Sequence, residues 1–353
     1  MVQHPAKGLR IHGADDILHL LRFFCAEFRM IDWSRRIHQY IYGKELIEME
    51  HVLTVAVVNF HPVWGDKEMN LNRICGYVRA AARRGADIVV LPETALSGYS
   101  NDPNPVREEK MHRRIAEPIP GPATEAVCAL AKQFGVYAAF GMPEREESKV
   151  YNATAVCLPD GAVKTYRKIH LPGDEIGWAD RGEDPLLFDT PWGPVGVGIC
   201  YDVFEFPELA RYYRAKGARL LLNTAAVPTL VGTMHQNNSL RTTAIASTMY
   251  VAIANVFGPD ANLQFQGGSG ILGPGDLQAV YGQYAGKPFG AEGANQGDMF
   301  IATIDLSYSL QCPLSDMFEG GPRTGEPDWR PDLYKRWYED VIDDPAWKAK
   351  YQK

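Results

Sequence analysis

The chain has 353 residues, of which 46% are hydrophobic and 22% charged, and its net charge is −7 at pH 7. This composition is that of a globular protein with one large or two ordinary domains, and it offers no basic surface for nucleic acid. The six cysteines form no CxxC pair and the nine histidines no HExxH-type spacing, so neither a disulfide scaffold nor a metal site is expected.

The N-terminal segment predicts a helical extension over residues 1–48. Its stretch "DDILHLLRFFCAEFRMIDWSRRIHQYIYG" has apolar residues at helical spacing and ends at Gly43. We expect it to pack on the core or to mediate oligomer contacts, with a membrane-surface helix as the alternative. No apolar run in the chain reaches the roughly 18 residues of a membrane span. The N-terminus also lacks the charged-then-apolar pattern of a signal peptide. A cytoplasmic protein without a membrane partner is therefore expected.

From residue 49 onwards, short apolar runs alternate with helical patterns. Strands are expected at 53–60, 87–93, 136–141, 194–200, 218–224, 249–256 and 299–306. Helices are expected at 70–85, 122–135, 206–217 and 235–248. Two further strands, "YNATAVCLP" and "VKTYRKI", flank Asp160-Gly161, which is a hairpin signature. This alternation predicts one domain over residues 49–310, in which two packed sheets are covered by helices.

Two Gly-rich segments complete the chain. Residues 258–298 are expected to form long surface loops, since glycine is the strongest local breaker of regular structure. Residues 311–353 form an aromatic tail punctuated by Gly and Pro, which we expect to lie extended on a surface, at a subunit interface.

Three reactive side chains each stand at the end of a strand-like run. Glu93 lies in "DIVVLPETALSGYS", Lys168 in "VKTYRKIHLPGDE" and Cys200 in "VGVGICYDVFEFPELAR". Each has an ordinary structural interpretation by itself: a helix N-cap neighbour, a solvated lysine and a buried small hydrophobe. Because ligands gather at the carboxyl ends of strands in α/β sheets, the three together predict one pocket.

The motifs "LPETALSGY", "YRKIHLPGDE" and "GVGICYDVFEFPE", in this order, resemble those of the nitrilase superfamily of carbon–nitrogen hydrolases. The resemblance runs from about residue 52 to 334 and includes "GMPEREESKVYNATAVCLPDG", "GGSGILGPGD" and "WRPDLY". Cys200-Tyr201-Asp202 is similar to the amidase and carbamoylase-like branches, whereas nitrilases tend to carry Trp-Glu after the cysteine. A Cys–His protease would need a histidine, and His170 is the candidate near a motif.

The resemblance implies a four-layer α-β-β-α sandwich, a homodimer or larger homo-oligomer, and no cofactor. It implies hydrolysis of a small amide or N-carbamoyl compound through a thioester on Cys200. Glu93 would be the general base, and Lys168 with the backbone N–H of Tyr201 would stabilise the oxyanion. A nitrilase forming a carboxylic acid from a nitrile is the alternative activity, and a catalytically idle binding protein is the alternative class.

A second glutamate is expected between the lysine and cysteine motifs. Glu175 precedes Gly182 as a glutamate does in relatives, so it is the candidate that orients Lys168 and the substrate; the rival, Glu144, is interpreted as structural. Further side chains could line the pocket: Tyr99, Tyr201, Phe204, Glu205, Asn223 and His235. Of these, Tyr99, Glu205 and Asn223 are the candidates for substrate binding, and Glu205 would favour a substrate with an ammonium group. Replacing Cys200 or Lys168 by alanine is expected to abolish turnover without unfolding the protein.

Overall fold

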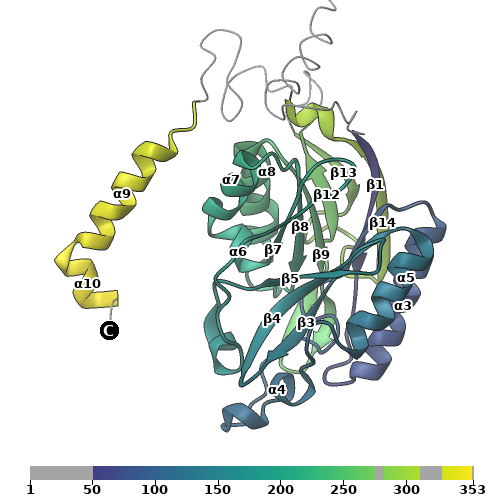
Figure 1. Ribbon diagram of the computed structural model, residues 1–353. Coiled ribbons are helices and arrows are strands. Elements are labelled where there is room, and N and C mark those ends of the chain that lie inside the picture. The colour runs from purple at the N-terminus through teal and green to yellow at the C-terminus, as the bar shows by residue number, and fades with distance from the viewer. Residues whose placement is uncertain (1–50, 275–280, 311–327, 352–353) are drawn as a thin grey trace, which may run out of the picture. The chain divides into compact units, whose positions relative to one another are not determined.

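A computed structural model describes residues 51–274, 281–310 and 328–351 (Figure 1). The predicted helical extension at residues 1–48 lies outside the described residues. Within those ranges, no helix is long and apolar enough to cross a membrane.

Within the described residues, the first large sheet has six strands in the order β14-β1-β2-β3-β4-β5. Strands β1, β2 and β3 are parallel neighbours, and the remaining pairs are antiparallel. The strand bounds are β1 Val52–Asn59, β2 Ile88–Val90, β3 Tyr137–Glu146, β4 Lys149–Cys157, β5 Val163–Arg167 and β14 Asp298–Asp305. The hairpin predicted around Asp160-Gly161 is confirmed as β4 and β5.

The second large sheet also has six strands in the described chain, in the order β13-β12-β9-β8-β7-β6. Its centre is the parallel set β7, β8 and β9. The strand bounds are β6 Leu186–Phe188, β7 Val195–Ile199, β8 Leu220–Ala225, β9 Tyr250–Asn255, β12 Gly270–Gly273 and β13 Gly282–Gly286. A separate hairpin joins β10 (Phe257–Asp260) to β11 (Leu263–Gln266).

Helices cover the outer face of each sheet. Figure 1 shows α3 (Lys67–Arg83) and α5 (Pro122–Phe134) beside the first sheet, and α7 (Pro207–Ala215) and α8 (Leu240–Ser247) beside the second. The shorter elements are η1 Arg107–Glu109, α4 Met111–Ile115, η2 Gly173–Gly177, α6 Tyr201–Phe204, the π-helix η3 Thr233–Ser239 and η4 Leu306–Leu310. The four-layer α-β-β-α sandwich predicted from the sequence is confirmed.

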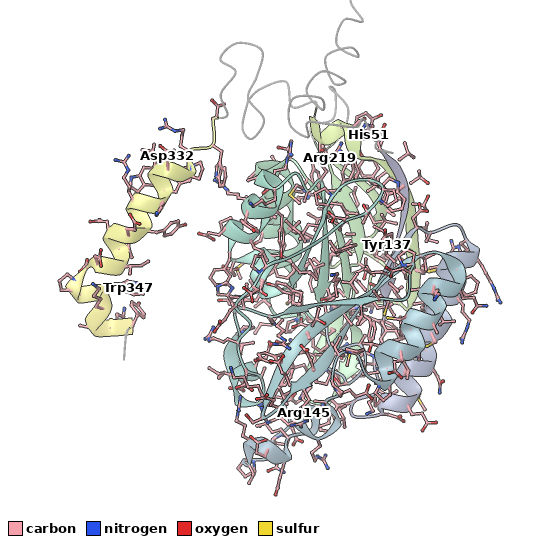
Figure 2. The ribbon with its side chains drawn as sticks, in the orientation of Figure 1. His51, Tyr137, Arg145, Arg219, Asp332 and Trp347 are labelled. Atoms are coloured by element: carbon pink, nitrogen blue, oxygen red, sulfur yellow. The ribbon has the colours of Figure 1, made fainter. Side chains whose placement is uncertain are left out.

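The alternation of side chains along β1 explains the layers. Val55 and Val57 belong to the core that includes the strands of the second sheet, whereas Ala56 and Val58 belong to the core that contains α3 and α5. Successive residues of a strand point to opposite faces, so one apolar run serves both cores. Side chains fill the space between the sheets (Figure 2). There the ring of Tyr137 on β3 packs against the ring of Phe188 on β6, with 5.7 Å between the two ring centroids.

Two sequence-based expectations were wrong. Residues 258–298 do not form only loops, because β10 to β13 lie there. Their glycines permit close strand packing: a Cβ at Gly273 would lie 2.5 Å from the ring of Tyr250. The tail is not extended where it is described, because α9 (Pro331–Asp343) and α10 (Pro345–Tyr351) are helices with proline in their first turn. Its place at a subunit interface stays a prediction.

Candidate active site

The structure brings three of the predicted side chains together at strand ends. Glu93 follows β2, Lys168 follows β5 directly, and Cys200 follows β7 directly. The ammonium nitrogen Nζ of Lys168 lies 2.7 Å from Oε1 of Glu93, and both side chains are fully buried. Strands β2 and β5 belong to the first sheet and β7 to the second, so the site is assembled between the two sheets.

Lys168 sits between two carboxylates. Its Nζ lies 2.7 Å from Glu175 Oε2 as well as from Glu93 Oε1. The Nδ2 of Asn152, on β4, donates to Oε1 of each glutamate at 2.7 Å. The Tyr99 hydroxyl donates to Glu175 Oε2 at 3.1 Å. Glu175, chosen over Glu144 from the sequence, is therefore part of the cluster.

Cys200 lies at a strained turn between β7 and α6. Its φ is +48° and its ψ is −107°, a conformation that costs a residue with a side chain about 1–3 kcal/mol. The backbone N–H of Cys200 donates to Oδ1 of Asn223 at 2.8 Å and to the carbonyl of Thr224 at 2.9 Å. Asn223 thus supports the turn from the neighbouring strand β8. Tyr201, whose amide is the candidate oxyanion donor, is the first residue of α6.

The environment of the Cys200 thiol disfavours the thiolate. Burial and the negative charge of Glu93 raise the pKa of Cys200 well above its ordinary value, although Lys168 and the N–H of Ala226 act in the opposite direction. The same Ala226 N–H donates to Glu93 Oε2 at 2.8 Å. The resting thiol is therefore protonated, and a reaction at its sulfur needs a base nearby.

The charges of the cluster depend on one another. Burial alone would lower the pKa of Lys168, but attraction by Glu175 and Glu93 raises that pKa well above its ordinary value, so the ammonium stays charged. Burial raises the pKa of Glu175 to about 7, with Lys168 lowering it and Glu93 raising it. The burial of Tyr99 and the charge of Glu175 raise the pKa of that phenol, which therefore stays protonated and donates.

The family model for carbon–nitrogen hydrolases matches residues 54–311. The chain belongs to this family. The nitrilase-superfamily resemblance of its motifs is confirmed, and the buried cluster of this hydrolase lies within the matched residues.

Curated relatives of the hydrolase include omega-amidases. The omega-amidase NIT2 of Xenopus tropicalis is 35% identical over 254 residues, covering 69% of this chain and 85% of the relative. That of Danio rerio is 34% identical over 292 residues, covering 79% and 95%. An amidase from Nesterenkonia sp. superposes with a TM-score of 0.64 at 21% identity, over 84% of this chain and all of that one, and shares its fold. These matches confirm the prediction of an amidase-type carbon–nitrogen hydrolase.

Two buried polar residues, one in the hydrolase site and one beside it, were missed in the sequence. One is Asn152, although its Tyr-Asn motif belongs to a stretch that carries the resemblance. The other is Asp202, two residues after Cys200. One oxygen of Asp202 accepts from the Tyr166 hydroxyl at 2.8 Å, and the other accepts from the backbone N–H of His170 at 2.8 Å. A buried polar residue among apolar ones was the available signal in both cases.

The remaining candidates have partners outside the cluster of Glu93, Lys168 and Glu175. His170 stacks on the ring of Phe206, with 3.5 Å between the centroids, and its Nδ1 lies 2.8 Å from Asp202 Oδ1. The charged groups that act on the Cys200 thiol in the described structure are Glu93, Lys168 and Glu175, so His170 is not its partner. The Glu144 carboxylate forms a bidentate ion pair with the Arg167 guanidinium, whose Nε and terminal nitrogen lie 2.7 and 2.8 Å from its two oxygens. Glu144 is therefore structural, as expected. The Glu205 carboxylate lies 3.0 Å from Nδ1 of His235. His235 would therefore compete with a substrate ammonium for this carboxylate.

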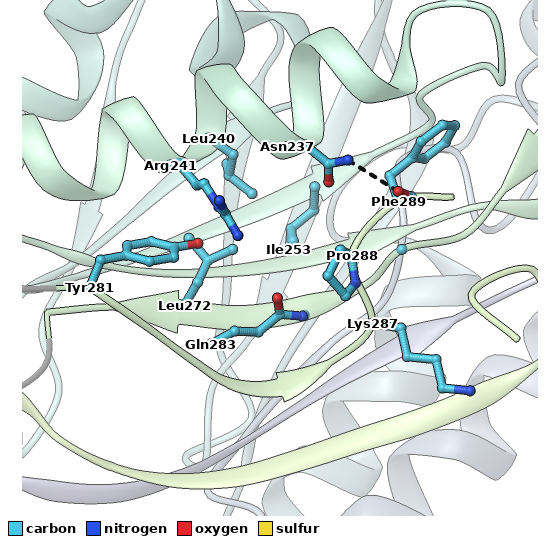
Figure 3. Close-up of a pocket in the computed structure, with 12 residues that line it drawn as sticks. Asn237, Leu240, Arg241, Ile253, Leu272, Tyr281, Gln283, Lys287, Pro288 and Phe289 are labelled. Atoms are coloured by element: carbon cyan, nitrogen blue, oxygen red, sulfur yellow. Dashed lines mark hydrogen bonds between the residues drawn. The ribbon is translucent and has the colours of Figure 1, made fainter. Parts of the chain in front are cut away.

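A separate hollow lies between α8 and strands β12 and β13 (Figure 3). Its volume of about 20 Å³ accommodates about one water molecule. Asn237 Nδ2 donates to the carbonyl of Phe289 at 3.1 Å, and the Arg241 guanidinium lies over the ring of Tyr281. The hollow is thus too small for an amide substrate. In the described part of the chain, no group of three or more His, Cys, Asp or Glu side chains could hold a metal ion.

Proposed function

We propose that this hydrolase cleaves the carbon–nitrogen bond of a small linear amide through a thioester on Cys200. One observation carries the proposal: a buried ammonium is shared by two buried carboxylates beside a cysteine held at a strained turn. The names of the omega-amidase relatives support a terminal amide as the substrate group. In addition, a mutant of the Nesterenkonia sp. AN1 amidase was solved with the acetamide moiety of fluoroacetamide added covalently at its active-site cysteine.

In the acylation step Glu93 takes the thiol proton as the sulfur attacks the amide carbonyl carbon, and negative charge develops on the carbonyl oxygen. Glu93 then gives its proton to the leaving nitrogen, so ammonia or an amine departs as the carbon–nitrogen bond breaks. The raised pKa of Cys200 favours this concerted use of a base over a thiolate formed in advance.

Lys168 has the right number of donors for a second role. An ammonium carries three protons, and two of them point to Glu93 and Glu175 at 2.7 Å. The third is free to donate to the developing oxyanion, together with the backbone N–H of Tyr201. Glu175, as the second acceptor at 2.7 Å, holds the ammonium in place together with Glu93.

Deacylation reuses the same groups. Glu93 takes a proton from a water molecule, whose oxygen attacks the thioester carbonyl. The carbon–sulfur bond breaks, the carboxylic acid leaves, and the proton returns to Cys200. Tyr99, bonded to Glu175, is the candidate to line the substrate side of the pocket.

Ammonia release from aliphatic, aromatic, ω- and N-carbamoyl amides, with matched nitriles, tests the proposal. We expect turnover of a linear amide, a thioester adduct detectable by mass spectrometry, and a loss of roughly 10⁴-fold or more in Cys200→Ala. Normal turnover by Cys200→Ala would refute the role of the thiol. Faster ammonia release from nitriles would instead support the nitrilase alternative, and no turnover with slow, substrate-insensitive alkylation of Cys200 would indicate an idle relative. A cytoplasmic location and a homo-oligomeric state stay predictions from the sequence.

A further inference from the structure

Asn152 lies where the two carboxylates of the cluster approach each other. It is fully buried on β4, and its Nδ2 lies 2.7 Å from one oxygen of Glu93 and 2.7 Å from one oxygen of Glu175. The orientation of the amide follows from its neighbours. A flipped amide would place its carbonyl oxygen against two carboxylate oxygens, with no proton between them.

The amide group completes a ring of donors and acceptors. Asn152 Nδ2 has two protons and gives one to each glutamate, and Lys168 Nζ does the same. Oε1 of Glu93 therefore accepts from two donors, while its Oε2 accepts from the N–H of Ala226. This fixes the Glu93 carboxylate in both position and rotation, as a base acting on a neighbouring thiol requires.

We propose that Asn152 is a positioning residue, which acts through Glu93 and Glu175 by bridging the two carboxylates, offsetting their repulsion and keeping Glu93 available as the base. The inference rests on the proposed function. Without Nδ2, two like charges would share one ammonium, and one carboxylate would take up a proton at a higher pH. The charged and titratable groups facing this pair are Lys168 after β5, Tyr99 in the loop before η1 and Cys200 after β7.

The fully buried Asn152 is tested in the full-length protein with Asn152→Ala and the equal-sized Asn152→Asp. The pH profile of kcat/KM is measured on the best amide, and the pH profile of Cys200 alkylation by iodoacetamide is measured by mass spectrometry. Loss of one hydrogen bond to a charged group should move the acid limb of both profiles up by about one to two pH units in Asn152→Ala. At a fixed pH below the acid limb this corresponds to a fall in kcat of roughly 10- to 100-fold, with KM little changed. Asn152→Asp, which adds a third carboxylate, should move the limbs at least as far.

Asn70→Ala is the matched control for losing a buried asparagine. Asn70 lies on α3, and its side chain bonds only to backbone groups of Val63 and Leu96 in the described structure. The Asn70→Ala substitution should lower the free energy of unfolding and leave the pH profiles of kcat/KM and of Cys200 alkylation unchanged.

The alkylation profile separates failure of this inference from failure of the proposed function. If both Asn152 variants lose stability as Asn70→Ala does, yet keep the wild-type limbs, Asn152 is only structural and the inference is overturned. If the wild type hydrolyses no amide but its alkylation limb still shifts in Asn152→Ala, the inference stands and the proposed function fails.

Discussion

Replacing Lys168 by methionine removes the positive charge of the cluster while keeping the length of the side chain. The ammonium is fully buried and lies 2.7 Å from each of two carboxylates. Removing one partner of a buried ion pair destabilises a protein by about 3–5 kcal/mol, because the other charge is left uncompensated. This is a larger cost in stability than the sequence led us to expect, because Lys168 was not expected to contribute to core packing.

The loss in activity has a separate cause. Removing one oxyanion donor lowers kcat by about 10²–10³-fold. We therefore expect Lys168→Met to lose at least that much under conditions in which circular dichroism shows it folded. Partial recovery of stability, but not of activity, is expected when Glu175→Gln is added, because one of the two uncompensated charges is then removed.

Urea unfolding at neutral pH measures the stability change. The control is Lys164→Met, because Lys164 is an exposed lysine on the same strand, β5. A surface change of this kind should stay within about 0.5 kcal/mol of the wild type. If Lys168→Met unfolds at the same urea concentration as Lys164→Met, Lys168 does not form the charged ion pairs with Glu93 and Glu175 that we assign to it. If its kcat is also unchanged, the oxyanion role is refuted.

Two further predictions concern Glu175 and the packing of Glu93. Because burial raises the pKa of Glu175 from 4.5 to about 7, the folded protein holds a proton that the unfolded chain releases; stability should therefore fall as pH rises from about 4.5 to 7. Glu175→Gln should remove about 3 kcal/mol of that dependence, and equal pH slopes in urea titrations of both proteins would contradict the assignment. Gly141→Ala would place a Cβ 2.5 Å from the Cα of Glu93, so we expect a loss of about 1–3 kcal/mol and a strongly reduced kcat. Gly76→Ala on α3, where nothing lies within 4 Å, should instead be neutral or stabilising in thermal unfolding, and equal behaviour of both variants would refute the close packing.

The positions of Glu93, Lys168 and Cys200 could be predicted because each ends an apolar run within a recognisable motif. A strand that is buried on both faces leaves a clear signal, and the residue after it must lie at the sheet edge. Glu175 was placed only by its spacing from Gly182, whose N–H donates to the Lys168 carbonyl at 2.8 Å.

The misses have physical reasons. Strands β12 and β13 are short and contain glycines, which local reasoning takes for loop residues, although here they allow another strand or ring to approach. Asn152 could not be distinguished from its strand neighbours, because its role depends on two glutamates that are 59 and 23 residues away in the chain. The pairing of Glu205 with His235 likewise arises only when α6 meets the π-helix η3.

The division of the reactive groups between the two sheets has a consequence for how this enzyme regains activity after denaturation. The bond from the Ala226 N–H to Glu93 joins residues 133 positions apart, and contacts so distant in sequence form late because long loops must close first. The strands β1 to β5 and β6 to β9, each contiguous in the chain, could recover their circular dichroism signal with their helices before any substrate is turned over. Catalysis thus serves as a sensitive reporter of sheet docking, returning only when the two halves of the sandwich have come together.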